Sequence, residues 1–155
     1  MIISDTKINN NIAKYSSQLK NLLAARPIKY SSWSQKFRVT LCESAGVYHF
    51  FENNGDSITS LYVGKAGFGR STWSLYKRLN QHFQVSQKNA LIGNIAKATT
   101  QSPVQIKESL CAREVYLQWL VLFTKTAENQ ENFESDLVWS ECFCKSILVP
   151  TYTNA

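Results

Sequence analysis

Residues 46–67 read GVYHFFENNGDSITSLYVGKAG and contain two short apolar runs separated by a polar turn. Asn54-Gly55 in the turn is a strong β-hairpin signal, because both residues tolerate the positive φ angles of tight hairpin turns. The flanking runs, 46–52 and 60–64, are rich in β-branched and aromatic residues, as strands are. The stretch therefore predicts a β-hairpin that carries one tyrosine near the middle of the first strand and another on the second.

Helical patterns lie on both sides of this hairpin. Before it, apolar residues recur at spacings of three and four over residues 6–24, until Arg26-Pro27 ends the pattern. Ser102-Pro103 is a typical helix start, with a serine N-cap followed by proline at the first helical position. We expect four helices after the hairpin, at residues 74–83, 87–99, 102–112 and 133–148.

Two further segments have the composition of strands. Residues 114–123, EVYLQWLVLF, are expected to form one, with continuation of the preceding helix as the alternative. Residues 37–41 would add a shorter one. The elements predict one α/β (α+β) sandwich domain over residues 1–155, with a small, mainly antiparallel three-stranded sheet flanked by helices. Residues 1–45 would be an N-terminal helical extension and residues 46–155 the core.

The charge of the chain is +6 and is unevenly distributed. Residues 1–82 contain eleven Lys/Arg against four Asp/Glu, whereas residues 83–155 contain six against seven. A basic first half suits a polyanion such as nucleic acid, although a soluble domain with a high pI would have the same balance. No apolar run approaches the ~18 residues that span a bilayer, and no signal peptide is recognised. We therefore expect a cytoplasmic protein without a membrane partner, whose four cysteines are reduced.

Four polar residues have positions that suggest one site. Lys65 follows the second apolar run of the hairpin. Arg78 and His82 are four residues apart on a predicted helix, so one lies above the other at the edge of its buried stripe. Glu141 lies at the rim of the apolar arc of the last helix, where a carboxylate is unusual. With Tyr48 and Tyr62 of the hairpin, these residues are our candidates for chemistry.

The same residues resemble the GIY-YIG nuclease superfamily. Its first triplet corresponds to Gly46-Val47-Tyr48 and its second to Tyr62-Val63-Gly64, and thirteen residues separate the two, a little more than is usual. The helix that follows in that family has an Arg and then an aromatic residue or His, which matches Arg78 and His82. The segments YVGKAG and SLYKRLNQHF are especially similar to the N-terminal incision domain of excision-repair nucleases.

The resemblance extends to the end of the chain. Glu141 is followed by Pro150 and Tyr152 at the spacing of that family. Thr153 occupies the position of the family's terminal Asn, and Asn154 comes one residue late. The resemblance implies a GIY-YIG-like fold over residues 46–154.

The resemblance also implies a metal-dependent endonuclease that hydrolyses phosphodiester bonds in DNA. Glu141 would be the single protein carboxylate that holds Mg²⁺ or Mn²⁺. Arg78 would clamp the scissile phosphate through its planar fork of donors. Tyr48 would act as the general base or orient the attacking water, which requires a nearby cation to lower its pKa. Lys65 would supply that cation or contact phosphate.

The remaining expected roles concern positioning and nucleic-acid binding. Tyr62 and His82 would position water or phosphate. The nucleic acid would be bound by Lys65, Arg70, Lys77, Arg78 and Asn154. Phe68, Arg70 and Trp73 would stack on or grip nucleic acid, or else pack as a lid.

Two other functions are open for the same fold. One is a nucleic-acid-binding module that has lost turnover, and the other is a protein-interaction domain with the N-terminal helix as its docking element. The substrate would be duplex or branched DNA, with RNA as a further candidate, in a setting such as DNA repair or restriction. Sequence specificity would be weak, or would come from a homodimer, a protein partner or residues 84–130.

Overall fold

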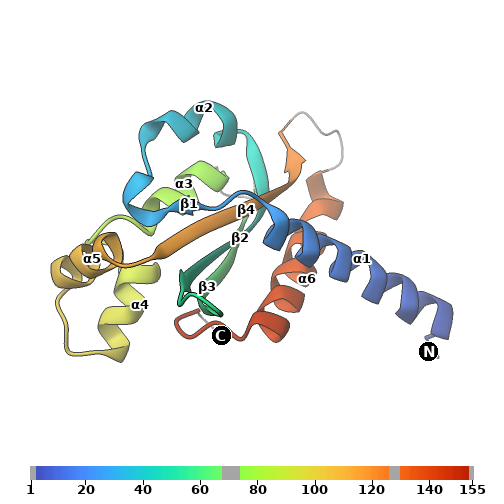
Figure 1. The fold of residues 1–155 in the computed structure, drawn as a ribbon. Helices are drawn as coiled ribbons and strands as arrows, with labels where there is room; N and C mark the ends of the chain where they lie inside the picture. The colour runs from blue at the N-terminus through green and yellow to red at the C-terminus, as the bar shows by residue number, and fades with distance from the viewer. Residues whose placement is uncertain (1–2, 68–73, 126–129, 154–155) are drawn as a thin grey trace.

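The chain folds into an α+β structure in which helices cover both faces of an open antiparallel sheet (Figure 1). The computed structural model describes residues 3–67, 74–125 and 130–153. Within those ranges there are six α-helices: α1 (Asp5–Ala24), α2 (Arg38–Leu41), α3 (Leu75–Gln81), α4 (Leu91–Ala98), α5 (Pro103–Ala112) and α6 (Gln130–Leu148). The strands are β1 (Ile28–Lys29), β2 (Ser44–Asn53), β3 (Ile58–Ala66) and β4 (Val115–Thr124), and the short 3-10 helices are Tyr30–Ser32 and Gln35–Phe37.

The β2–β3 hairpin forms the centre and one edge of the sheet. The strand order is β1-β4-β2-β3, and every pairing is antiparallel. Tyr48 on β2 is paired with Gly64 on β3 and with Trp119 on β4. Gly55 in the turn has a φ of 92°, a conformation that glycine adopts without strain. The predicted hairpin is therefore confirmed.

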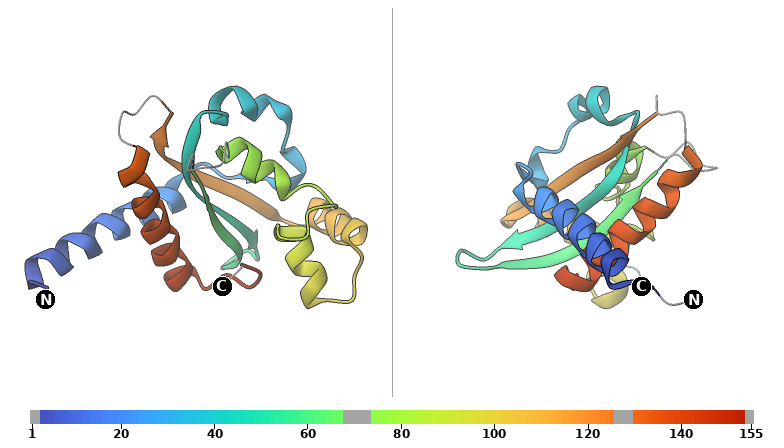
Figure 2. Two further views of the ribbon diagram at one scale, coloured as in Figure 1. Left: turned by 180° about the vertical axis from the view of Figure 1, so that it is seen from behind. Right: turned by 90° about the vertical axis from the view of Figure 1, so that its right-hand side faces the viewer.

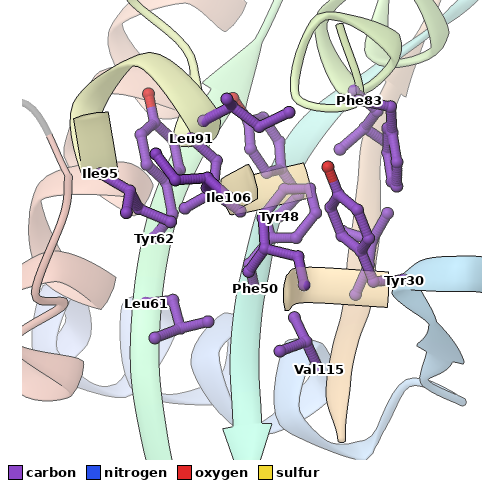
Figure 3. Packing of buried hydrophobic residues seen from close by; sticks show 14 of the residues in the cluster. Tyr30, Tyr48, Phe50, Leu61, Tyr62, Phe83, Leu91, Ile95, Ile106 and Val115 are labelled. Atoms are coloured by element: carbon purple, nitrogen blue, oxygen red, sulfur yellow. The ribbon is translucent and has the colours of Figure 1, made fainter. Parts of the chain in front are cut away.

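Alternate residues of β2 point to two different cores, as the period of a strand requires. Tyr48 and Phe50 belong to the larger core, which α3, α4 and α5 cover (Figure 3). Val47 belongs to a smaller core on the other face, with Leu22 of α1 and Cys144 of α6. Figure 2 shows α1 and α6 together on one side of the sheet and α3 to α5 on the other.

Two glycines of the hairpin are required by the close approach of neighbouring atoms. A Cβ at Gly46 would overlap the backbone carbonyl of Leu120 on β4. A Cβ at Gly64 would overlap the ring and hydroxyl of Tyr48, which lies directly across the hairpin. The absence of a side chain at Gly64 therefore makes room for the Tyr48 phenol, which is fully buried.

Several local predictions are confirmed. Ser102 caps α5 in a complete capping box, with Pro103 at the start of the helix. Residues 115–124 form a strand, not a continuation of the preceding helix. The N-terminal helix is present as α1. Cys42, Cys111, Cys142 and Cys144 are all free thiols.

Other boundaries differ from the prediction. Residues 37–41 are not a strand, because they complete a 3-10 turn and then form α2. The sheet has four strands instead of three, since the two residues of β1 pair with Leu117 and Tyr116 of β4. β3 continues to Ala66, so Lys65 lies within the strand. α4 begins at Leu91 instead of residue 87, and α6 begins three residues early. None of the helices in the described ranges could cross a bilayer.

Candidate active site

A cleft of about 440 Å³ lies between the β2–β3 hairpin, α3 and α6. Its lining residues come from four separate elements or their ends: Tyr48, Tyr62, Gly64, Lys65, Ala66, Gly67, Arg78, Gln81 and Glu141. The structure thus brings together five of the six residues expected to carry chemistry. The sixth, His82, does not line the cleft.

Arg78 provides a half-buried positive charge on one wall of the cleft. One terminal nitrogen of its guanidinium donates to Gln81 Oε1 at 2.7 Å, and the other donates to Tyr62 Oη at 3.3 Å. The guanidinium also lies near enough to the Tyr48 hydroxyl to act on the pKa of that phenol. Gln81 was missed from the sequence; its only signal was its position three residues after Arg78 on the same helix. It orients the guanidinium towards the two phenols.

His82 lies behind Tyr48, within the core, and holds three segments together. Its side chain is fully buried, so it does not contact water or phosphate in the cleft as the sequence led us to expect. Nδ1 accepts a hydrogen bond from the backbone N–H of Leu91 at 2.9 Å, and Nε2 lies 2.8 Å from Tyr48 Oη. The backbone carbonyl of His82 accepts a hydrogen bond from the Tyr30 hydroxyl at 2.7 Å.

These contacts determine the tautomer of His82. Burial, followed by the charge of Arg78, lowers the pKa of His82 well below its usual value, so the imidazole is neutral at pH 7. Because Nδ1 accepts from Leu91, the single ring proton is on Nε2. His82 therefore donates to Tyr48 Oη, and the Tyr48 oxygen accepts this hydrogen bond.

Opposing effects act on the pKa of Tyr48. Burial is the largest and, together with the neighbouring Tyr62, raises this pKa well above its usual value. The charge of Arg78 acts in the opposite direction, while Glu141 raises the pKa. The cation that favours the phenolate is therefore Arg78, rather than Lys65 as we expected.

Glu141 reaches the cleft from α6 and has a positively charged partner. Its carboxylate forms an ion pair with Lys145 Nζ at 3.0 Å, one helical turn along α6, and the Glu141 side chain is 15% exposed. No cluster of three or more His, Cys, Asp or Glu occurs among the residues that the structure describes. The Glu141 carboxylate fits a hard cation such as Mg²⁺, which can be bound through one carboxylate with water completing its shell.

The residues expected to bind nucleic acid are placed unequally. Lys65 and Arg78 line the cleft, whereas Lys77 is exposed on α3 outside it. Phe68, Arg70, Trp73 and Asn154 lie outside the described residues, so the structure says nothing about their roles.

Thr153, at the position of the terminal Asn in the GIY-YIG resemblance, contacts the backbone of Val63. Its hydroxyl accepts from the Val63 backbone N–H at 3.3 Å and donates to the Val63 carbonyl at 2.5 Å. The backbone N–H groups of Thr151 and Tyr152 donate to the carbonyls of Ser60 and Leu61. The tail therefore covers the outer edge of β3, the strand that carries Tyr62.

A second buried histidine, His49, lies on the other face of β2. Its Nδ1 is 3.2 Å from Gln118 Nε2 and its Nε2 is 2.9 Å from Ser60 Oγ. Nδ1 accepts from the Gln118 amide, so the ring donates to Ser60 through Nε2. Because the imidazole is a donor here, it does not activate the Ser60 hydroxyl. Burial lowers the pKa of His49 to about 4.

The two buried histidines predict a stability that falls on acidification. An unfolded histidine has a pKa near ~6.5, so between that pH and about 4 the unfolded chain takes up a proton that folded His49 does not. Each such histidine lowers the free energy of unfolding by about 1.4 kcal/mol per pH unit as the pH falls. His82 acts in the same direction. Urea unfolding of the wild type and of His49→Gln, measured from pH 7 to pH 4, should give a shallower pH dependence for the variant. Equal slopes would contradict the assignment of a neutral buried His49.

Comparison with known proteins adds no assignment to this geometry. No family model, no curated protein and no solved structure matches the chain. The case for a function therefore rests on the residues of the cleft and on what they can do together.

Proposed function

We propose that this chain is a metal-dependent endonuclease that hydrolyses phosphodiester bonds in DNA. The observation that carries the proposal is the meeting of a phenol, a guanidinium and a carboxylate in one cleft, from β2, α3 and α6. Phosphodiester hydrolysis needs an activated water, a group that neutralises the charge on the phosphate, and a group that stabilises the leaving oxygen. Tyr48 and Arg78 offer the first two functions, and Glu141 would offer the third through a divalent cation held on its carboxylate.

Arg78 is the group suited to bind the scissile phosphate. Its planar guanidinium can donate two parallel hydrogen bonds to phosphate oxygens. Lys65 lines the same cleft and adds a second positive charge. Gln81 and Tyr62 hold the guanidinium in place before the substrate arrives, which lowers the entropic cost of binding.

Tyr48 is the candidate general base. Its oxygen accepts a hydrogen bond from His82, and such a bond stabilises the phenolate relative to the phenol. In the free protein, burial keeps the proton on the phenol, so Tyr48 must release this proton to solvent before it can accept one from the attacking water. Because the side chain is fully buried, its hydroxyl meets water only when a neighbour moves. A phosphate bound by Arg78 would lie beside this phenol, because both residues line the same cleft.

Glu141 is the candidate metal ligand. A divalent cation bound there would supply positive charge next to the phosphate and the leaving oxygen. Glu141 is also one of the groups that raise the pKa of Tyr48. Neutralising its charge therefore removes one of the effects that keep Tyr48 protonated.

A second candidate is a nucleic-acid-binding module without turnover. The ion pair between Glu141 and Lys145 favours it, because the carboxylate already has a cation of the protein itself as its partner. This function needs Arg78 and Lys65 but no metal. It predicts salt-sensitive DNA binding without metal-dependent nicking.

Glu141→Gln tests the nuclease and has a matched control on the same helix. With supercoiled plasmid and Mg²⁺ or Mn²⁺, we expect the wild type to nick DNA and Glu141→Gln to lose at least about 100-fold in rate. Glu134→Gln removes an exposed carboxylate of α6 outside the cleft and should match the wild type. Equal cleavage by all three proteins would contradict the role of Glu141. DNA binding without cleavage by the wild type would favour the second candidate.

Lys145→Gln tests whether Lys145 competes with the metal. The Lys145 ammonium and a bound metal ion would compete for the Glu141 carboxylate. Removal of the ammonium should therefore tighten Mn²⁺ binding by roughly 5-fold, as expected for a partly exposed ion pair. Titration calorimetry with Mn²⁺ and no DNA measures this affinity. The control is Lys14→Gln. It removes the lysine of α1 that pairs at 2.9 Å with Asp136, a different carboxylate of α6. Unchanged or weaker Mn²⁺ binding by Lys145→Gln would contradict the competition.

A further inference from the structure

The N-terminal half of α1 extends away from the body of the molecule (Figures 1 and 2). Every residue from Ile3 to Lys14 is exposed, whereas Leu19 and Leu22 in the second half are buried against the sheet and α6. The exposed half nevertheless continues the apolar stripe of the helix. Ile8 and Ile12, one turn apart, are 43% and 53% exposed.

The local sequence does not favour a helix in this half. Asn9, Asn10 and Asn11 are consecutive, and asparagine is a poor helix former. The packed second half of α1 can nucleate the helix, but exposed end turns of this composition gain little from tertiary packing. The Ser4 N-cap satisfies one backbone N–H but does not cover the isoleucines. The ridge formed by Ile8 and Ile12 is therefore left uncovered within one chain.

A groove of complementary character lies beside this ridge, between α1 and α6. Its volume is about 470 Å³, and it is lined by Asn11, Tyr15, Trp139, Cys142, Phe143 and Ser146. The tilted rings of Tyr15 and Phe143 lie with their centroids 6.1 Å apart. Trp139 is 59% exposed, an unusual exposure for the largest apolar side chain. The ridge and the groove are thus adjacent on one surface.

We propose that this surface is the interface of a homodimer, in which the Ile8–Ile12 ridge of each protomer lies in the α1–α6 groove of the other. A two-fold interface uses the same patch on both subunits, and a patch that contains both a ridge and a groove can be self-complementary. The inference is independent of the proposed chemistry, because none of the residues that line this groove lines the active-site cleft.

The charges of the two helices favour a second copy as the occupant. The sequence of α1 has three lysines and one aspartate, a net charge of +2, whereas α6 has one lysine and four acidic residues, a net charge of −3. In the proposed dimer each α1 lies against the α6 of the partner, so opposite charges face each other across the interface. Lys14 and Asp136 already form such a pair within one chain at 2.9 Å. DNA would match the charge of α1 but would not cover its isoleucines.

Sedimentation equilibrium of the full chain tests the dimer directly. We expect a dimer at micromolar concentration and a dissociation constant at least about 100-fold higher for Ile12→Asp. Val39→Asp is the matched control, since Val39 is an exposed apolar residue on α2, away from the groove, and should leave the dimer unchanged. A wild type that stays monomeric, with or without DNA, would overturn the proposal, as would a dimer that Ile12→Asp does not weaken.

Amide hydrogen exchange provides a second readout that does not depend on a variant. Residues 5–14 should exchange rapidly in dilute protein and become protected as the concentration rises through the dissociation constant. The amides of β2 should stay protected throughout and report that the fold is intact. Protection of residues 5–14 that is independent of concentration would contradict a role for the second copy in ordering α1.

Discussion

The hydrogen bond from His82 Nε2 to the Tyr48 hydroxyl is the contact on which the rest of the site depends. It joins β2 to the end of α3, and the bond from Leu91 N–H to Nδ1 adds the start of α4. Because the imidazole is buried and neutral, its two nitrogens have fixed and different roles. The same contact that packs the helices on the sheet therefore also sets the hydrogen bonding of the phenol proposed as the base.

The charges around Tyr48 are arranged so that a substrate and a cation can change its state. Arg78 favours the phenolate, while burial and Glu141 oppose it. Both charged groups have partners within the chain, Gln81 and Lys145, that occupy them in the absence of ligands. In our proposal a phosphate takes over Arg78 and a divalent cation takes over Glu141. The helix that brings Glu141 to the cleft also forms one wall of the proposed dimer groove, so a dimer would fix the distance between its two clefts.

Features with a local cause could be predicted from the sequence. The hairpin followed from Asn54-Gly55, and the start of α5 followed from Ser102-Pro103. Tyr48, Arg78 and Glu141, which we expected in one site, do line one cleft. Contacts between distant segments could not be predicted. β1, for example, is defined by the pairing of Ile28 and Lys29 with the edge of β4.

The burial of His82 and the ion pair of Lys145 with Glu141 also could not be predicted from the sequence. A helical position at the edge of an apolar stripe fits a cleft-facing residue as well as a core-facing one, and only the packing of α4 against His82 decides between them. Lys145 stands four residues after Glu141, a spacing common on exposed helix faces, and becomes informative only once Glu141 is known to line the cleft. The most direct measurement of the central claim is the single-turnover cleavage rate of Tyr48→Phe. The control is Tyr116→Phe, which removes a phenol on β4 that is hydrogen-bonded to exposed Glu114. The account predicts a loss of at least about 100-fold for Tyr48→Phe with DNA affinity retained, and no loss for Tyr116→Phe; wild-type cleavage by Tyr48→Phe would contradict it.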